Sequence, residues 1–236
     1  MRREVLLATA FVLTSCASTL AQFVHPDLKS GKTRVHSILL MPVQVQLNRV
    51  GMKGPEPMME ESLDTERAFV PLIVNILQGL GYKVDPEALA AAALQSDTEL
   101  RYTVDELQKR FDNELARMNG KAKDVRKGRF SLGDEVANLP PGDGVDALLF
   151  VRISGQILTG KRKAFDLLVP GYGAFDLAFI RFGLVDAKTG AVLYFARPSV
   201  RGNIADDPDR ADNAIRKSFE NLAKVSPGAA KVEAQK

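Results

Sequence analysis

The chain has 236 residues, of which 45% are apolar, and 32 basic side chains stand against 29 acidic ones. A formal net charge of +3 spread along the chain argues against a dedicated nucleic-acid-binding protein, because such proteins concentrate basic residues on one element. The length and apolar fraction suffice for one well-buried core, and a single cysteine excludes a disulfide within the chain. These features favour one domain that is stabilised by packing.

The N-terminus has the features of an export signal. A basic start (MRRE) precedes an apolar run over residues 5–13, which is too short to span a bilayer, and small residues then lead to Cys16. The segment VLTSC resembles the lipobox of bacterial lipoproteins. This resemblance implies a signal peptide over residues 1–15, and a mature protein whose Cys16 carries a thioether-linked diacylglycerol and an acylated amine, palmitate being a typical acyl chain. An ordinary secretory signal with a chance cysteine is the alternative.

The residue after the cysteine bears on the destination of the protein. Ala17 stands where inner-membrane lipoproteins of the enteric pattern carry aspartate, so the resemblance favours the outer membrane, with the protein facing the periplasm. No later stretch reaches the roughly 18 uninterrupted apolar residues of a membrane-spanning helix. We therefore expect the lipid on Cys16 to be the link to the membrane.

The first half of the chain predicts alternating strands and helices. Residues 16–34 are polar and broken by Pro26 and Gly31, which predicts a flexible tether. A strand over residues 35–45, a loop over 48–61, a helix over 65–81 and a short strand over 82–85 follow. We further expect a helix over 87–94, and another that opens with the capping-box pattern at Thr103 and Glu106.

The second half predicts strands and one last helix. Residues 146–158 form a long strand that is first continuously apolar and then alternating, and residues 175–186 and 191–197 flank a turn with Gly190. A helix is expected over 208–225, and residues 226–236 form a polar tail that is expected to be disordered.

This order predicts an α/β (α+β) fold in a single domain over residues 35–225. The strand–helix–strand start predicts a parallel pair with a right-handed crossover, and the later turn predicts an antiparallel meander beside it. We expect a mixed sheet of about five strands, with helices mainly on one face.

Four segments resemble a group of envelope proteins that share one α/β domain, among them the curli-secretion lipoprotein CsgG, the penicillin-binding-protein activator LpoB and the amino-terminal domain of TolB. The matching segments are ILLMP (38–42), GLGYKV (79–84), GVDALL (144–149) and LVDAKTGAVL (184–193). The loops over 44–64 and 159–174 and the helical segment over 99–129 follow no single member. The resemblance therefore implies the fold and leaves the activity within the group open.

The sequence offers no recognisable catalytic, cofactor or metal site. His25 and His36 have no second histidine and no cysteine at ligand spacing, and no serine lies in a Gly-x-Ser-x-Gly motif. We therefore expect a protein that is not an enzyme and holds no cofactor or metal.

Two loops have the composition of partner-binding surfaces. Met52, Met58 and Met59 form an adaptable apolar stretch, although they could equally fold onto the sheet. A second loop places a basic cluster beside apolar residues, which would suit acidic lipid headgroups, an anionic glycan or an acidic protein surface; a hairpin end without a partner is the alternative. Its residues are Lys161, Arg162, Lys163 and Phe165.

These features together predict a non-catalytic, periplasm-facing lipoprotein that binds or helps to assemble a cell-envelope protein complex. The sequence is also compatible with a homo-oligomer. The alternative is a subunit of a CsgG-like secretion pore, although neither loop has the roughly ten-residue alternating strands of a pore wall. A hydrolase of envelope material is the third hypothesis, and it requires a cleft that gathers carboxylates.

Overall fold

The computed structural model describes residues 22–85, 88–118, 121, 124, 127–139, 144–168 and 175–226. Cys16 and the expected signal over residues 1–15 lie outside the described residues, as do residues 227–236 of the expected tail.

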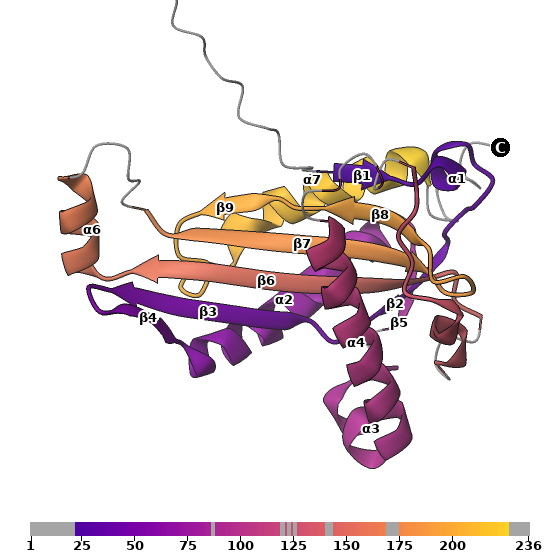
Figure 1. Cartoon of the computed structure of the whole chain (residues 1–236), viewed down its shortest axis with the longest axis horizontal. Helices are drawn as coiled ribbons and strands as arrows, with labels where there is room; N and C mark the ends of the chain where they lie inside the picture. The colour runs from indigo at the N-terminus through magenta and orange to yellow at the C-terminus, as the bar shows by residue number, and fades with distance from the viewer. Residues whose placement is uncertain are drawn as a thin grey trace, which may run out of the picture.

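The described residues build one mixed sheet of nine strands, with helices on both of its faces (Figure 1). Six strands neighbour one another in the order β1-β8-β7-β6-β2-β5, while β3 pairs with β6 and β4, and β9 pairs with β7. The strands are β1 (Gln22–Val24), β2 (Ser37–Leu40), β3 (Gln44–Gly51), β4 (Gly54–Pro57), β5 (Lys83–Asp85), β6 (Ala147–Leu158), β7 (Leu177–Asp186), β8 (Val192–Ala196) and β9 (Ser199–Arg201). The helices are α1 (Pro26–Lys29), α2 (Met59–Gly79), α3 (Ala91–Ser96), α4 (Thr98–Met118), α6 (Gly160–Leu167) and α7 (Asp209–Val225), with a 3-10 turn η1 (Asp134–Asn138).

The predicted parallel pair and the predicted antiparallel meander are both confirmed. Strands β2 and β5 run parallel, as the strand–helix–strand pattern predicts, and the connection between them contains α2. Strands β6, β7 and β8 form the antiparallel meander. In the turn after β7, Gly190 has a φ of 68°, and the Asp186 carboxylate accepts hydrogen bonds from Lys188 N and Thr189 N.

The expected count of five strands is wrong, because β1 and β9 add two short strands and a hairpin occupies the expected loop over residues 44–64. Pro42 lies in the break between β2 and β3, so the expected strand over residues 35–45 is two strands that pair in parallel with successive parts of β6. After β3 the chain turns and forms β4, which pairs back on β3. The helix α2 then begins at Met59, six residues earlier than the sequence pattern predicts.

The expectation of helices mainly on one face is also wrong. On one face, buried apolar residues of α2 and α7 pack on the sheet, with Phe69 and Phe219 fully buried. On the other face α4 crosses in front of β6 and β7 (Figure 1), and its Phe111 ring stacks on Phe150 at 4.5 Å between centroids. The continuously apolar first half of β6 explains this arrangement, because a strand that is apolar on both faces needs a cover on each. The helix α4 begins at Thr98, before the expected capping box, and Leu100 N donates to the Asp97 carboxylate.

Part of the expected tether and one residue of the expected tail belong to the fold. Residues 22–24 pair as β1 with β8, and Phe23 and Leu28 are buried, so the tether prediction is wrong for residues 22–34. Two apolar side chains outweighed the polar composition of this segment. Ser226, the first residue of the expected tail, is buried as well. Its hydroxyl accepts a hydrogen bond from Val35 N, and its carbonyl accepts one from the Tyr82 hydroxyl.

Candidate functional site

The sheet has a face that α4 covers only in part. Along β6, Leu148 and Phe150 point toward α4, and the next side chains on the same face are Arg152, Ser154 and Gln156. This change from apolar to polar side chains marks where the helical cover ends. It coincides with the point where residues 146–158 change from a continuous apolar run to alternation.

Three arginines form a row across this uncovered part of the sheet. Arg152 on β6 and Arg181 on β7 are direct cross-strand partners. Arg197 follows the last residue of β8, and its charge lowers the pKa of Arg181. Like charges that face each other across two strands destabilise a sheet. We call this row, together with Gln44, Gln46 and Ser154, the arginine face.

Arg152 is held in place by the protein itself. Its side chain is buried, its Nε lies 2.7 Å from Asp112 Oδ1, and its Nη2 donates to the Gln108 carbonyl. The guanidinium also lies over the Phe111 ring, 5.4 Å from the centroid. Arg152 is therefore a neutralised, rigid part of the site.

Arg181 and Arg197 have no such compensation. Partial burial, followed by the charge of Arg197, lowers the pKa of Arg181, and the charge of Asp112 opposes this shift only in part. Arg181 Nη1 donates to the Ser154 hydroxyl at 3.2 Å, and Arg197 lies over the Phe179 ring at 4.8 Å. Within the part of the chain that the structure describes, neither arginine has a carboxylate within salt-bridge distance. Both guanidinium groups are therefore available to an anionic partner.

A cleft of about 610 Å³ opens beside the arginine face, between α4, α2 and the strands. Guanidinium groups bind carboxylates and phosphates through pairs of parallel hydrogen bonds, and glutamine and serine side chains add further donors. Glu66 also lines the cleft, and partial burial raises its pKa although the charge of Arg67 acts in the opposite direction. The lining residues are Val43, Gln44, Val45, Gln46, Glu66, Asp112, Leu115, Ala116, Arg152, Ile153, Ser154 and Arg181.

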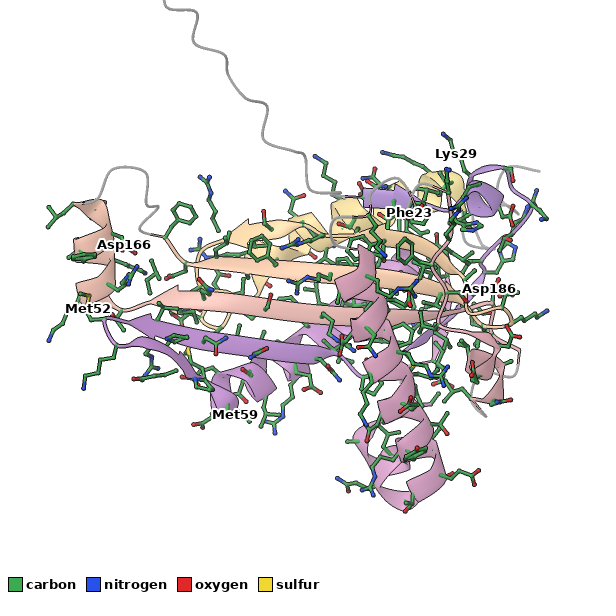
Figure 2. All side chains as sticks on the ribbon, in the orientation of Figure 1. Phe23, Lys29, Met52, Met59, Asp166 and Asp186 are labelled. Carbon is green, nitrogen blue, oxygen red and sulfur yellow. The ribbon has the colours of Figure 1, made fainter. Side chains whose placement is uncertain are left out.

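The three methionines of the first predicted loop do not form one surface. Met58 is buried in the core between the sheet and α2, so it is not part of the partner-binding surface that the sequence suggests. Met52 lies in the turn between β3 and β4, and Met59 begins α2; both side chains are exposed, at separate places in Figure 2.

The second predicted loop begins with a helix, α6. Lys161 and Phe165 are exposed on it, as the sequence suggests. Arg162 and Lys163 are half-buried and pair with Asp166 and Asp176, so they contribute less free charge than their sequence implies.

Both histidines make hydrogen bonds within the fold. His25 Nδ1 accepts a hydrogen bond from Asp27 N at the start of α1, and His36 N donates to the Asp146 carboxylate. Among the described residues, no group of three or more His, Cys, Asp or Glu side chains could hold a metal ion. None of the helices in this part of the chain has the length and apolar character to cross a membrane.

Sequence reasoning missed the arginine face. Its members lie on β3, β6, β7 and the segment after β8, and only the strand pairing brings them together. The alternation of polar with apolar residues in β6 and β7 carried part of the signal. The sequence does not specify that arginines would face one another.

No protein-family model matches the chain, and no curated protein matches it. Among solved structures, the chain is similar to lipoprotein GNA1162 from Neisseria meningitidis at 16% identity, with 79% of this chain and 96% of that chain covered and a TM-score of 0.36. It is also similar to two structures of the PelC dodecamer from Paraburkholderia phytofirmans. Each is 11% identical with a TM-score of 0.34, and they cover 80% and 88% of this chain and 89% and 95% of theirs. The grouping with CsgG, LpoB and TolB stays a prediction.

Proposed function

We propose that this protein is a non-catalytic envelope lipoprotein. Lipid on Cys16 anchors it to the periplasmic side of the outer membrane, and it binds an acidic surface of a cell-envelope protein through the arginine face. The observation that carries the binding role is the pair Arg181 and Arg197, which lie next to each other without a carboxylate partner in the described part of the chain.

The arginine face suits the binding of a macromolecule. It spans several strands of a rigid sheet, and Arg152 is already fixed by Asp112 and Gln108. An acidic partner would relieve the repulsion between neighbouring guanidinium groups and gain hydrogen bonds from side chains that need little reordering. Arginine is also the charged residue that is most enriched in protein interfaces.

The lipobox pattern and the position of β1 together limit how far the domain can lie from the membrane. Residues 17–21 separate Cys16 from the first strand residue, Gln22. Six residue steps span at most about 20 Å when fully extended. In this proposal the start of β1 therefore lies within about 20 Å of the lipidated cysteine.

Mass spectrometry of the protein isolated from membranes of its own bacterium tests the anchor. We expect a mature N-terminus at Cys16 that carries a diacylglycerol thioether and an N-acyl chain. An intact leader with a free Cys16 thiol, in material recovered from the cytosol, would contradict the proposal. Crosslinking in intact cells tests the binding role. Arg181→Gln with Arg197→Gln should deplete a specific crosslinked partner, while Arg216→Gln, at an exposed position of α7, should not.

One observation favours a hydrolase as a second candidate. The cleft gathers two carboxylates, Glu66, whose pKa is raised by partial burial, and Asp112, which is ion-paired with Arg152, and a pair of carboxylates can serve as acid and base. Turnover of peptidoglycan or a glycan by the purified domain, abolished by Glu66→Gln, would support this candidate. Unchanged substrate after long incubation would remove it.

A further inference from the structure

The helix α6 has its polar and apolar sides reversed relative to a helix that packs on a core. Its buried residue is Asp166, whereas Leu167 is 77% exposed and the following Leu168 is 81% exposed. The Phe165 side chain is also exposed. Large apolar side chains that project together into solvent mark an interaction site.

Polar contacts on the inner side of α6 fix this orientation. The Thr159 hydroxyl caps the helix by accepting from Arg162 N, and Asp166 lies 2.9 Å from Arg162 Nε. The Asp176 carboxylate accepts from both Lys163 Nζ and Leu158 N, at 2.9 and 2.8 Å. These contacts of Asp166 and Asp176 hold the polar side of α6 against the protein, so the apolar side chains point into solvent.

The neighbouring segments add further apolar residues at the same end of the molecule. Thr159 N donates to the Val50 carbonyl, which places the β3–β4 turn and its exposed Met52 beside the start of α6 (Figure 2). Phe175, also exposed, immediately precedes Asp176. Five of the eight large apolar side chains that are exposed among the described residues thus lie at this end, which we call the tip: Met52, Phe165, Leu167, Leu168 and Phe175.

Basic residues surround these apolar side chains. Lys161 is exposed on α6, Lys53 follows Met52, and Arg201 lies over the Phe175 ring at 4.7 Å from the centroid. Within the described residues none of these three cations makes a salt bridge, and the exposed acid nearby is Glu56 on β4. The tip therefore combines projecting apolar groups with excess positive charge.

We propose that the tip inserts into the interface of a membrane that contains anionic lipid. Apolar side chains that reach the acyl boundary, with lysines at the level of the headgroups, are the chemistry of interfacial membrane binding. Each basic residue near an anionic surface adds to the attraction. The proposal goes beyond the lipid on Cys16 because it gives the domain a second membrane contact, which fixes its orientation.

A fluorescent label at the tip tests this proposal. In a Cys16→Ser chain the introduced residue is the one cysteine, so Leu168→Cys can be labelled uniquely with an environment-sensitive dye. The matched control is Leu63→Cys, a leucine on α2 that is 51% exposed and does not belong to the tip. Both variants are titrated with vesicles of phosphatidylcholine, with and without phosphatidylglycerol, in which part of the lipid carries a quencher on its acyl chains.

We expect the dye at position 168 to shift to shorter wavelength and to be quenched on anionic vesicles, while the dye at position 63 is unchanged. Lys161→Glu should weaken this response about threefold to tenfold. Equal responses at both positions would overturn the proposal. Loss of the response on Arg181→Gln but not on Lys161→Glu would overturn it too, because the arginine face would then contact the lipid. A spectral shift without vesicles that follows protein concentration would identify the tip as a contact between copies of the chain, which is likewise a contrary result.

Discussion

Arg152 and Arg181 face each other across β6 and β7, yet Asp112 neutralises only Arg152. The buried arginine has the acid, a backbone carbonyl and an aromatic ring, while its partner has the hydroxyl of Ser154 and the repulsion of Arg197. The fold thus fixes and neutralises the guanidinium of Arg152, whereas those of Arg181 and Arg197 have no carboxylate partner among the described residues. This asymmetry is what we expect of a surface that meets an anionic partner.

Asp112→Asn should lower the free energy of unfolding by about 1–2 kcal/mol, because it leaves the Arg152 charge without its acid. The cost is small because the Asp112 side chain is 49% exposed and water can partly replace it. Urea denaturation monitored by circular dichroism gives the value. In an Arg152→Met background the same substitution should cost almost nothing, and an equal cost in both backgrounds would show that the ion pair is not the cause.

Gly183→Ala should destabilise the protein by about 2–3 kcal/mol, because an added Cβ would lie 2.2 Å from Phe111 Cε2. Phe111 packs between this glycine and Phe150, and its stacked ring leaves little room to move. Thermal denaturation should show a smaller penalty in a Phe111→Leu background. The control is Gly79→Ala, where no atom lies within 4 Å of the added Cβ and the melting temperature should not fall.

Asp146 should make stability depend on pH in the acid range. Burial alone would raise the pKa of Asp146, but hydrogen bonds from His36 N, Ser37 N and the Ser37 hydroxyl hold it below its ordinary value of 3.8. A carboxyl group whose pKa is lowered by folding stabilises the protein above the unfolded pKa, and this contribution is lost as the pH falls through the folded pKa.

Asp146→Asn should therefore reduce the free energy of unfolding by about 1 kcal/mol at neutral pH. The difference from the unmodified protein should shrink as the pH falls well below 3.8. Denaturation curves across this range give the measurement, with Asp105→Asn on the exposed side of α4 as the control. A difference that stays constant to the lowest pH would contradict the assignment.

Tyr82→Phe should cost about 1 kcal/mol, because it removes the hydrogen bond that joins the segment before β5 to the carbonyl of Ser226 after α7. The hydroxyl is buried, and burial raises its pKa, so solvent cannot readily replace the lost donor. Tyr102→Phe removes an exposed hydroxyl and should leave the unfolding midpoint unchanged. Equal effects of the two substitutions would mean that the contact with Ser226 does not contribute.

Much of the fold could be predicted because hydrophobic period and turn chemistry act locally. The α7 pattern places Ala211, Ile215, Phe219 and Leu222 on one face, and all four are fully buried. Asp186 and Gly190 likewise specify their turn by hydrogen bonding and by a positive φ. In such elements each residue favours the same local structure that the fold requires.

The parts that could not be predicted depend on pairing between distant segments. Residues 44–57 contain Gly54, Pro55 and Pro57 and resemble a loop, but β6 offers an unpaired edge that β3 completes. The strand β1 (Gln22–Val24) is too short to show an alternating pattern in the sequence, and it forms by pairing with β8. The arginine face also depends on such pairing, because only the register of β6 with β7 places Arg181 opposite Arg152.

Photo-crosslinking from position 179, where Phe179 lies beneath Arg197, tests the role of the arginine face most directly. A benzophenone amino acid is placed there in the full-length, membrane-anchored protein, and the cells are irradiated. We expect one discrete crosslinked protein that is lost with Arg181→Glu and Arg197→Glu and is absent when the probe replaces Tyr102. The same product in the charge-reversed variant, or no product from position 179, would contradict the account.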